Sequence, residues 1–91
     1  MKTILNTKLI KKEEIGTNFA ISYIELTADS NYDGQFATKT IKLMHDCPDK
    51  IGTNENGEVT IDDSLIAEFV SQACRYFKES RLTFADKILF V

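Results

Sequence analysis

The sequence predicts an α+β domain in which about four mostly antiparallel strands form a sheet and one amphipathic helix packs on one face. Two observations carry this prediction. Residues 18–27 alternate with a period of two, and residues 63–80 hold an apolar stripe at spacings of three and four. Turn signals between these segments divide the chain into elements in the order β-β-β-α-β.

Three segments in the first half of the chain are predicted strands. Residues 3–11 are rich in Ile, Leu and Thr, and residues 18–27 place Ala20 and Ile24 on one side with Phe19 and Tyr23 on the other. The DSNYDG sequence that follows is typical of a turn, and residues 36–44 form the next β-rich run. The second and third strands are therefore expected to form an antiparallel hairpin.

The second half begins with an expected loop over residues 46–57, which contain the only proline and two of the four glycines. Residues 59–61 are predicted to form a short extended segment. A helix over residues 63–80 then follows, with Asp62 or Asp63 as its N-cap and basic residues near its other end. The predicted buried stripe of this helix consists of Ile66, Phe69, Val70, Ala73 and Phe77.

Residues 83–91 end in KILFV, and so apolar a segment is expected to be a buried strand. Most aromatic side chains fall on predicted elements and are expected in the core; they are Phe19, Tyr23, Phe36, Phe69, Phe77, Phe84 and Phe90.

A length of 91 residues leaves room for one domain, residues 1–91. With a single helix, one face of the sheet stays uncovered, so either the sheet curls on itself or a partner covers that face. Self-association into a homodimer is the simplest form of that second arrangement.

Charge is distributed unevenly along the chain. Residues 1–12 carry a net charge of +4, residues 13–63 a net −8, and residues 64–91 a net +1. The acidic middle either solvates loops or forms a face that meets a basic partner. Direct binding of nucleic acid is not expected, because neutralising phosphates requires a clustered basic surface and only two arginines are present.

A calcium site is the sharpest alternative. Asp29, Asn31, Asp33 and Gly34 match the opening of a calcium-binding loop, in which alternating oxygen ligands converge on a hard cation. The match ends there, because Thr40 stands where a bidentate glutamate is required and the flanks are predicted strands. A rise in thermal stability with calcium would support this alternative.

Other chemistry has weaker support. His45, Cys47 and Cys74 include the single histidine, yet they lack the paired spacing of a zinc site. No nucleophile has an identifiable base and orienting group, and no phosphate-binding glycine pattern occurs. We therefore expect no catalytic residues, no metal and no cofactor.

These observations favour a small non-enzymatic protein-interaction module: a regulator, an inhibitor or an accessory subunit. Its acidic loops would meet a basic protein, including a nucleic-acid-binding protein, as a phage-type inhibitor or DNA mimic does. Because no segment reaches the ~20 apolar residues of a membrane span and cysteines are few, we expect a cytoplasmic protein without membrane contact. The predicted partner-binding residues are Asp29, Tyr32, Asp33, Asp49, Glu55 and Glu58.

Overall fold

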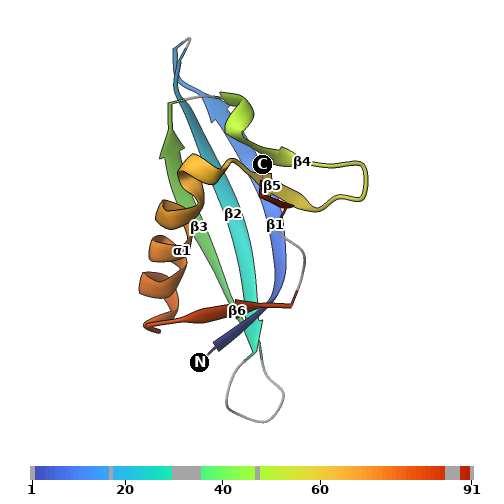
Figure 1. Cartoon of the computed structure of the whole chain (residues 1–91), viewed down its shortest axis with the longest axis vertical. Coiled ribbons are helices and arrows are strands. Elements are labelled where there is room, and N and C mark those ends of the chain that lie inside the picture. Colours follow the sequence, from blue (N-terminus) through green and yellow to red (C-terminus); the bar gives the residue numbers. More distant parts are fainter. Residues whose placement is uncertain (1, 17, 30–35, 47, 86–88, 91) are drawn as a thin grey trace.

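Three long strands and one short strand form a four-stranded sheet, sheet A, in the computed structural model (Figure 1). The structure describes residues 2–16, 18–29, 36–46, 48–85 and 89–90. The strand order is β3-β2-β1-β6; β1 to β3 pair antiparallel, and β6 lies parallel to β1. The strands are β1 (Lys2–Glu14), β2 (Ala20–Asp29), β3 (Phe36–His45) and β6 (Leu82–Phe84). This confirms the predicted α+β class and the antiparallel β2–β3 hairpin.

The alternation predicted for the second strand sets the two faces of sheet A. Ala20, Ser22, Ile24, Leu26 and Ala28 are all fully buried on one face. Their neighbours in register include Ile41 opposite Ile24 and Leu43 opposite Ser22, so β3 buries Ile41, Leu43 and His45 on the same face. We call this the buried face and its opposite the outer face.

The outer face of sheet A is polar over most of its length. Across the three long strands, Lys8 lies opposite Glu25, and Thr27 lies opposite Thr38 with their hydroxyl oxygens 3.3 Å apart. Such cross-strand pairs of opposite charge and of threonines stabilise a solvated sheet face. Water can therefore cover much of the face that the helix leaves open.

A second, three-stranded sheet, sheet B, was not predicted. It has the order β4-β5-β7, with β4 (Ile51–Thr53), β5 (Val59–Ile61) and β7 (Leu89–Phe90), and a short 3₁₀ helix, η1 (Pro48–Lys50), precedes it. The expected loop over residues 46–57 is therefore wrong over η1 and β4, while the short extended segment 59–61 is confirmed. Ile51 and Ile61 pair across β4 and β5 and are both fully buried, which gives these short strands tertiary support.

The single helix, α1 (Asp63–Phe77), has the predicted apolar stripe against the core. Asp62 is its N-cap, which settles the choice that the sequence left open. The helix ends three residues earlier than predicted because Lys78 adopts a left-handed conformation, with φ of 54°. The backbone N–H groups of Lys78 and Glu79 donate to carbonyls of the last helical turn, which completes a C-terminal cap.

The core lies where α1 and sheet B cover the buried face of sheet A (Figure 1). Phe69 is fully buried and stacks on Phe84 with ring centroids 6.0 Å apart. Two aromatic predictions are wrong: Phe19 is 51% exposed and Phe36 is 63% exposed. Phe19 precedes β2 and Phe36 begins β3 on the outer face, so neither reaches the covered side of the sheet. The buried members of the core cluster are Ile4, Ile24, Leu26, Ala28, Ile41, Leu43, Ile51, Val59, Ile61, Phe69, Ala73 and Phe77.

The predicted strand over residues 83–91 is split between the two sheets. β6 extends sheet A beside β1, and β7 extends sheet B beside β5. The apolar end of this segment, KILFV, indicated a strand but could not show that the chain leaves one sheet for the other. Within the described residues, no helix is long and apolar enough to cross a membrane.

Candidate functional site

The segment between β3 and α1, residues 46–63, carries a concentration of acidic side chains, and we call it the acidic arm. It contains six acids and one lysine, a net charge of −5. Its β4–β5 hairpin extends sideways from sheet A (Figure 1). All six acids are exposed or half-buried, so each can meet solvent or a partner. They are Asp46, Asp49, Glu55, Glu58, Asp62 and Asp63.

The base of the acidic arm is fixed to the core. Ile51, Val59 and Ile61 have no exposed surface. The backbone N–H of Asp62 donates to the carbonyl of Lys50 at 2.8 Å, which joins the two ends of the hairpin. Burial of three β-branched side chains holds the exposed carboxylates on a defined support.

The tip of the arm is held by the backbone and the side chain of Asn54, whose N–H donates to the Glu58 carbonyl at 2.9 Å and whose carbonyl accepts from the Gly57 N–H at 3.0 Å. The side-chain Oδ1 of Asn54 accepts hydrogen bonds from the backbone N–H groups of Asn56 and Glu58, both at 2.9 Å, and its Nδ2 donates to Glu58 Oε1 at 3.1 Å. Gly57 has a φ of 78°, a conformation that glycine adopts at little cost. The tip is therefore a defined turn that holds Glu58 in place and leaves Glu55 exposed.

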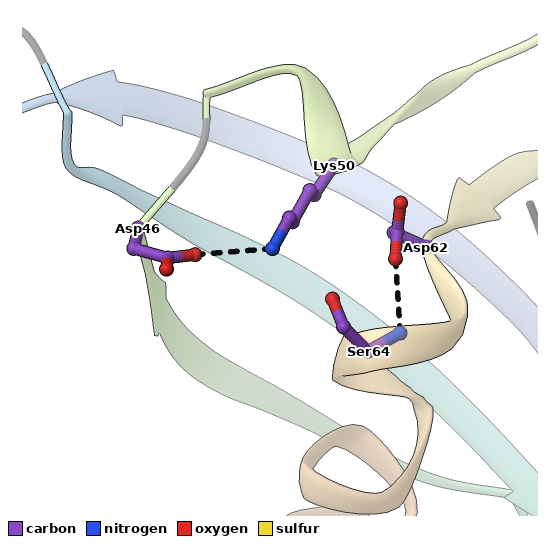
Figure 2. Close-up of polar contacts among 4 residues, drawn as sticks. All are labelled: Asp46, Lys50, Asp62 and Ser64. Carbon is purple, nitrogen blue, oxygen red and sulfur yellow. Dashed lines mark hydrogen bonds and ion pairs between the residues drawn. The ribbon is translucent and has the colours of Figure 1, made fainter.

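Lys50 lies among the acids of the arm and forms an ion pair with Asp46, with Nζ and Oδ1 3.2 Å apart (Figure 2). The hydrogen bond and the positive charge of Lys50 lower the pKa of Asp46. Asp46 is largely exposed, so water screens this pair and its energetic value is small. The lysine neutralises one carboxylate, and the arm remains strongly negative.

Asp62 connects the arm to α1. Its Oδ1 accepts a hydrogen bond from the backbone N–H of Ser64 at 2.9 Å (Figure 2). This hydrogen bond lowers the pKa of Asp62, because it favours the ionised carboxylate. The side chain therefore has a structural role as the N-cap of the helix, in addition to the negative charge it adds to the arm.

The six partner-binding residues predicted from the sequence do not lie together. Asp49, Glu55 and Glu58 belong to the acidic arm. Asp29 ends β2, and β2 and β3 pair along their whole length, so Asp29 and the start of the arm are separated by a ten-residue strand, about 30 Å. Tyr32 and Asp33 lie outside the described residues.

Asp29 has a structural contact. Its Oδ1 accepts a hydrogen bond from the backbone N–H of Thr3 at 2.9 Å and so links the end of β2 to the start of β1. The other candidate calcium ligands, Asn31 and Asp33, lie outside the described residues. The flanks of that turn are β2 and β3, strands as predicted, whereas the calcium-binding helix–loop–helix motif has helices there.

His45, the single histidine, pairs with a serine in the core. The Nε2 atom of His45 and the Oγ atom of Ser22 are 3.0 Å apart, and the two residues are 4% and 0% exposed. A nucleophile and its base would have this spacing, but a substrate cannot reach a serine with no exposed surface. The pair satisfies two polar groups inside the core.

The cysteines do not join His45 in an identifiable metal site. Cys74 is a free, half-buried thiol on α1, and Cys47 lies outside the described residues. Among the residues that the structure describes, no group of three or more His, Cys, Asp or Glu side chains could hold a metal ion.

Sequence reasoning missed the residues that organise the arm. Asp46 and Lys50 stand four residues apart, a spacing that suits an ion pair on one turn of helix, and Asn54 opens the Asn-Glu-Asn-Gly turn signal.

Comparison of the chain with protein-family models, with curated proteins and with solved structures finds no match.

Proposed function

We propose that this protein is a non-enzymatic protein-interaction module of the cytoplasm, which binds a basic protein surface through the acidic arm. The observation that supports the proposal most is the net charge of −5 on a segment whose base is buried in the core. Regulators, inhibitors and accessory subunits act by such contacts. A nucleic-acid-binding protein, with its phosphate-binding basic surface, is the class of partner that fits this charge.

Two physical properties make the arm suited to this role. Clustered charge of one sign accelerates encounter with an oppositely charged surface. A hairpin already fixed by Asn54 and by the buried base loses little conformational entropy on binding. The proposed binding should therefore be fast and should weaken steeply as salt rises.

Affinity capture from a lysate of the native host tests the proposal. The arm variant combines Asp49→Asn, Glu55→Gln and Glu58→Gln, which remove charge with little change in shape. Glu58→Gln keeps the oxygen that accepts from Asn54. The expected result is a stoichiometric basic protein that is captured at low salt, is released at moderate salt, and is lost with the arm variant.

A matched control removes three charges elsewhere, through Glu14→Gln, Glu25→Gln and Glu68→Gln, all outside the acidic arm. It has the same net charge as the arm variant, so it separates the effect of the arm from that of overall charge. Equal loss of the captured protein with both variants, or capture of nothing by the unaltered protein, would overturn the proposal.

A further inference from the structure

β3 is the terminal strand of sheet A, and within the described part of the chain no strand pairs with its outer edge. An unpaired strand edge presents backbone N–H and C=O groups that can pair with another chain. At ten residues, β3 is long for an edge strand that stays open. Helix α1 packs on the buried face of β3 (Figure 1). A strand added at this edge would therefore lie beside α1.

The flank of α1 that turns away from the core contains a hollow. Val70 and Tyr76 stand three residues on either side of the buried Ala73, so they lie on opposite flanks of the helix. Val70 packs against the core, whereas Tyr76 is 42% exposed. The hollow has a volume of about 400 Å³, and the described residues that line it are Gln72, Arg75 and Tyr76. Because α1 covers the terminal strand, this flank lies on the side of the free edge of β3.

The charges at this edge are positive. β3 carries Lys39 and Lys42 and no acidic residue. Lys39 pairs with Leu26 on the helix side of sheet A, and Lys42 lies on the outer face. α1 runs opposite to β3, so Arg75 near the end of α1 and the first half of β3 lie at the same end of the sheet (Figure 1). The edge therefore favours an acidic strand, because opposite charges across a strand pair are stabilising.

A second copy of this domain does not fit at the edge. Pairing of β3 with itself about a two-fold axis would place the two α1 helices on one face about 5 Å apart, which is the spacing of neighbouring strands. Packed helices need about 8–10 Å between their axes. A single extended segment brings no second helix, so its backbone can reach β3.

We propose that the β3 edge binds an extended acidic segment of a partner protein, which joins sheet A as an added strand beside α1. Backbone hydrogen bonds to β3 hold the segment, and its side chains alternate between the two faces of the sheet. On the helix side, an acidic residue across from Lys39 meets this lysine and Arg75. On the outer face, a second acidic residue lies across from Lys42.

Apolar residues at the two ends of the segment complete the match. Phe36 and Met44 stand at the ends of β3 on the outer face and are 63% and 59% exposed. One strand pair with two apolar contacts buries less than the about 800 Å² per partner of a stable complex, so we expect a dissociation constant on the order of 100 micromolar. The acidic arm takes no part in this binding, so this proposal and the function proposed above fail independently.

A synthetic peptide tests the proposal. It has nine residues and capped ends, with valine at each end, glutamate at the third and sixth positions, and threonine elsewhere. Paired antiparallel with β3, it places its valines across from Met44 and Phe36. Its glutamates then lie across from Lys42 and Lys39. Titration with this peptide should shift the NMR signals of the backbone amides of residues 38–42 and approach saturation at about 1 millimolar. Unshifted β3 amides at that concentration would overturn the proposal.

Two altered peptides separate the parts of the proposal. Lysine in place of both glutamates should abolish binding, because like charges then face each other across the strand pair. Prolines at the fourth and fifth positions should also abolish it. Backbone N–H groups alternate in direction along a strand, so one of the two that are lost had faced β3. Binding of either altered peptide as tight as that of the original would overturn the proposal.

Variants of the protein locate the contact. Lys39→Gln with Lys42→Gln should weaken binding of the glutamate peptide by about fivefold, because two pairs of opposite charge are lost. Lys8→Gln with Lys12→Gln is the matched control: it removes the same charge from β1, which β2 separates from β3. Equal weakening by both variants would overturn the contact at the β3 edge. Shifts of the β3 amides that appear on raising the protein concentration alone would place a second copy there and overturn the acidic segment.

Discussion

Replacing Asn54 with alanine should loosen the tip of the acidic arm without disturbing its base. The substitution removes the Oδ1 acceptor of two backbone N–H groups, those of Asn56 and Glu58, and the Nδ2 donor to the Glu58 carboxylate. The buried residues of β4 and β5 are untouched. The change therefore separates the shape of the tip from the stability of the fold.

The size of the effect follows from how far each hydrogen bond is buried. The bond from the Glu58 N–H is partly buried, and such a bond contributes about 1 kcal/mol net. The bond from the Asn56 N–H is exposed, so water replaces most of it. A free energy of about 1 kcal/mol corresponds to about fivefold faster amide exchange, so the Glu58 amide should speed up by about that factor and the Asn56 amide by less.

Amide hydrogen exchange followed by NMR provides the measurement. Asn56→Ala is the matched control. Asn56 contacts Asn54 through its backbone N–H, which the substitution keeps, and Asn56 is exposed. Wild-type exchange at Glu58 in the Asn54→Ala variant would refute the assignment of Asn54 as the organiser of the tip. Faster exchange at Ile51 and Ile61 as well would refute the separation of tip from base.

Three further predictions concern the core and the helix. Phe69→Ala should lower the free energy of unfolding by about 3–5 kcal/mol in urea denaturation, whereas Tyr76→Ala, at a side chain 42% exposed, should change it little. Ser22→Ala should cost about 1–3 kcal/mol in the same assay, because His45 Nε2 loses its buried hydroxyl; wild-type stability would contradict that role. Because its hydrogen bond lowers the pKa of Asp62, the stabilisation it gives is present above the unfolded-state pKa and is lost as pH falls through the folded-state pKa. Asp62→Asn should therefore reduce the loss of stability as pH falls below the unfolded-state pKa of an aspartate, and an unchanged pH profile would contradict this role of the carboxylate.

The helix and strands whose apolar residues recur at a regular spacing were predictable, because that spacing lies within each segment. The helix stripe around Phe69 and the alternation around Ile24 each sort one apolar face from one polar face. Phe19 and Phe36 show where this reasoning fails. Both are β-compatible aromatic residues, but their exposure depends on which face of the sheet a helix covers and where each strand begins.

For the acidic arm, the sequence predicted the charge but not the shape. Its charge could be counted from the sequence, and Asp49, Glu55 and Glu58 were named from that count. Its shape could not be predicted, because β4 and β5 are three residues each and depend on burial of Ile51 and Ile61 against the rest of the core. Strands this short carry too few side chains for a periodic signal.

The sequence by itself determined the α+β class, the β2–β3 hairpin, the buried face of α1 and the acidic character of residues 46–63, because local periodicity, turn residues and charge are properties of neighbouring residues. Only the tertiary structure decided that Asp29 and the acidic arm lie at opposite ends of the β2–β3 ladder, that residues 82–90 divide between two sheets, and that β3 is an edge. These features depend on strand order and register, which are set by contacts between segments far apart in the chain.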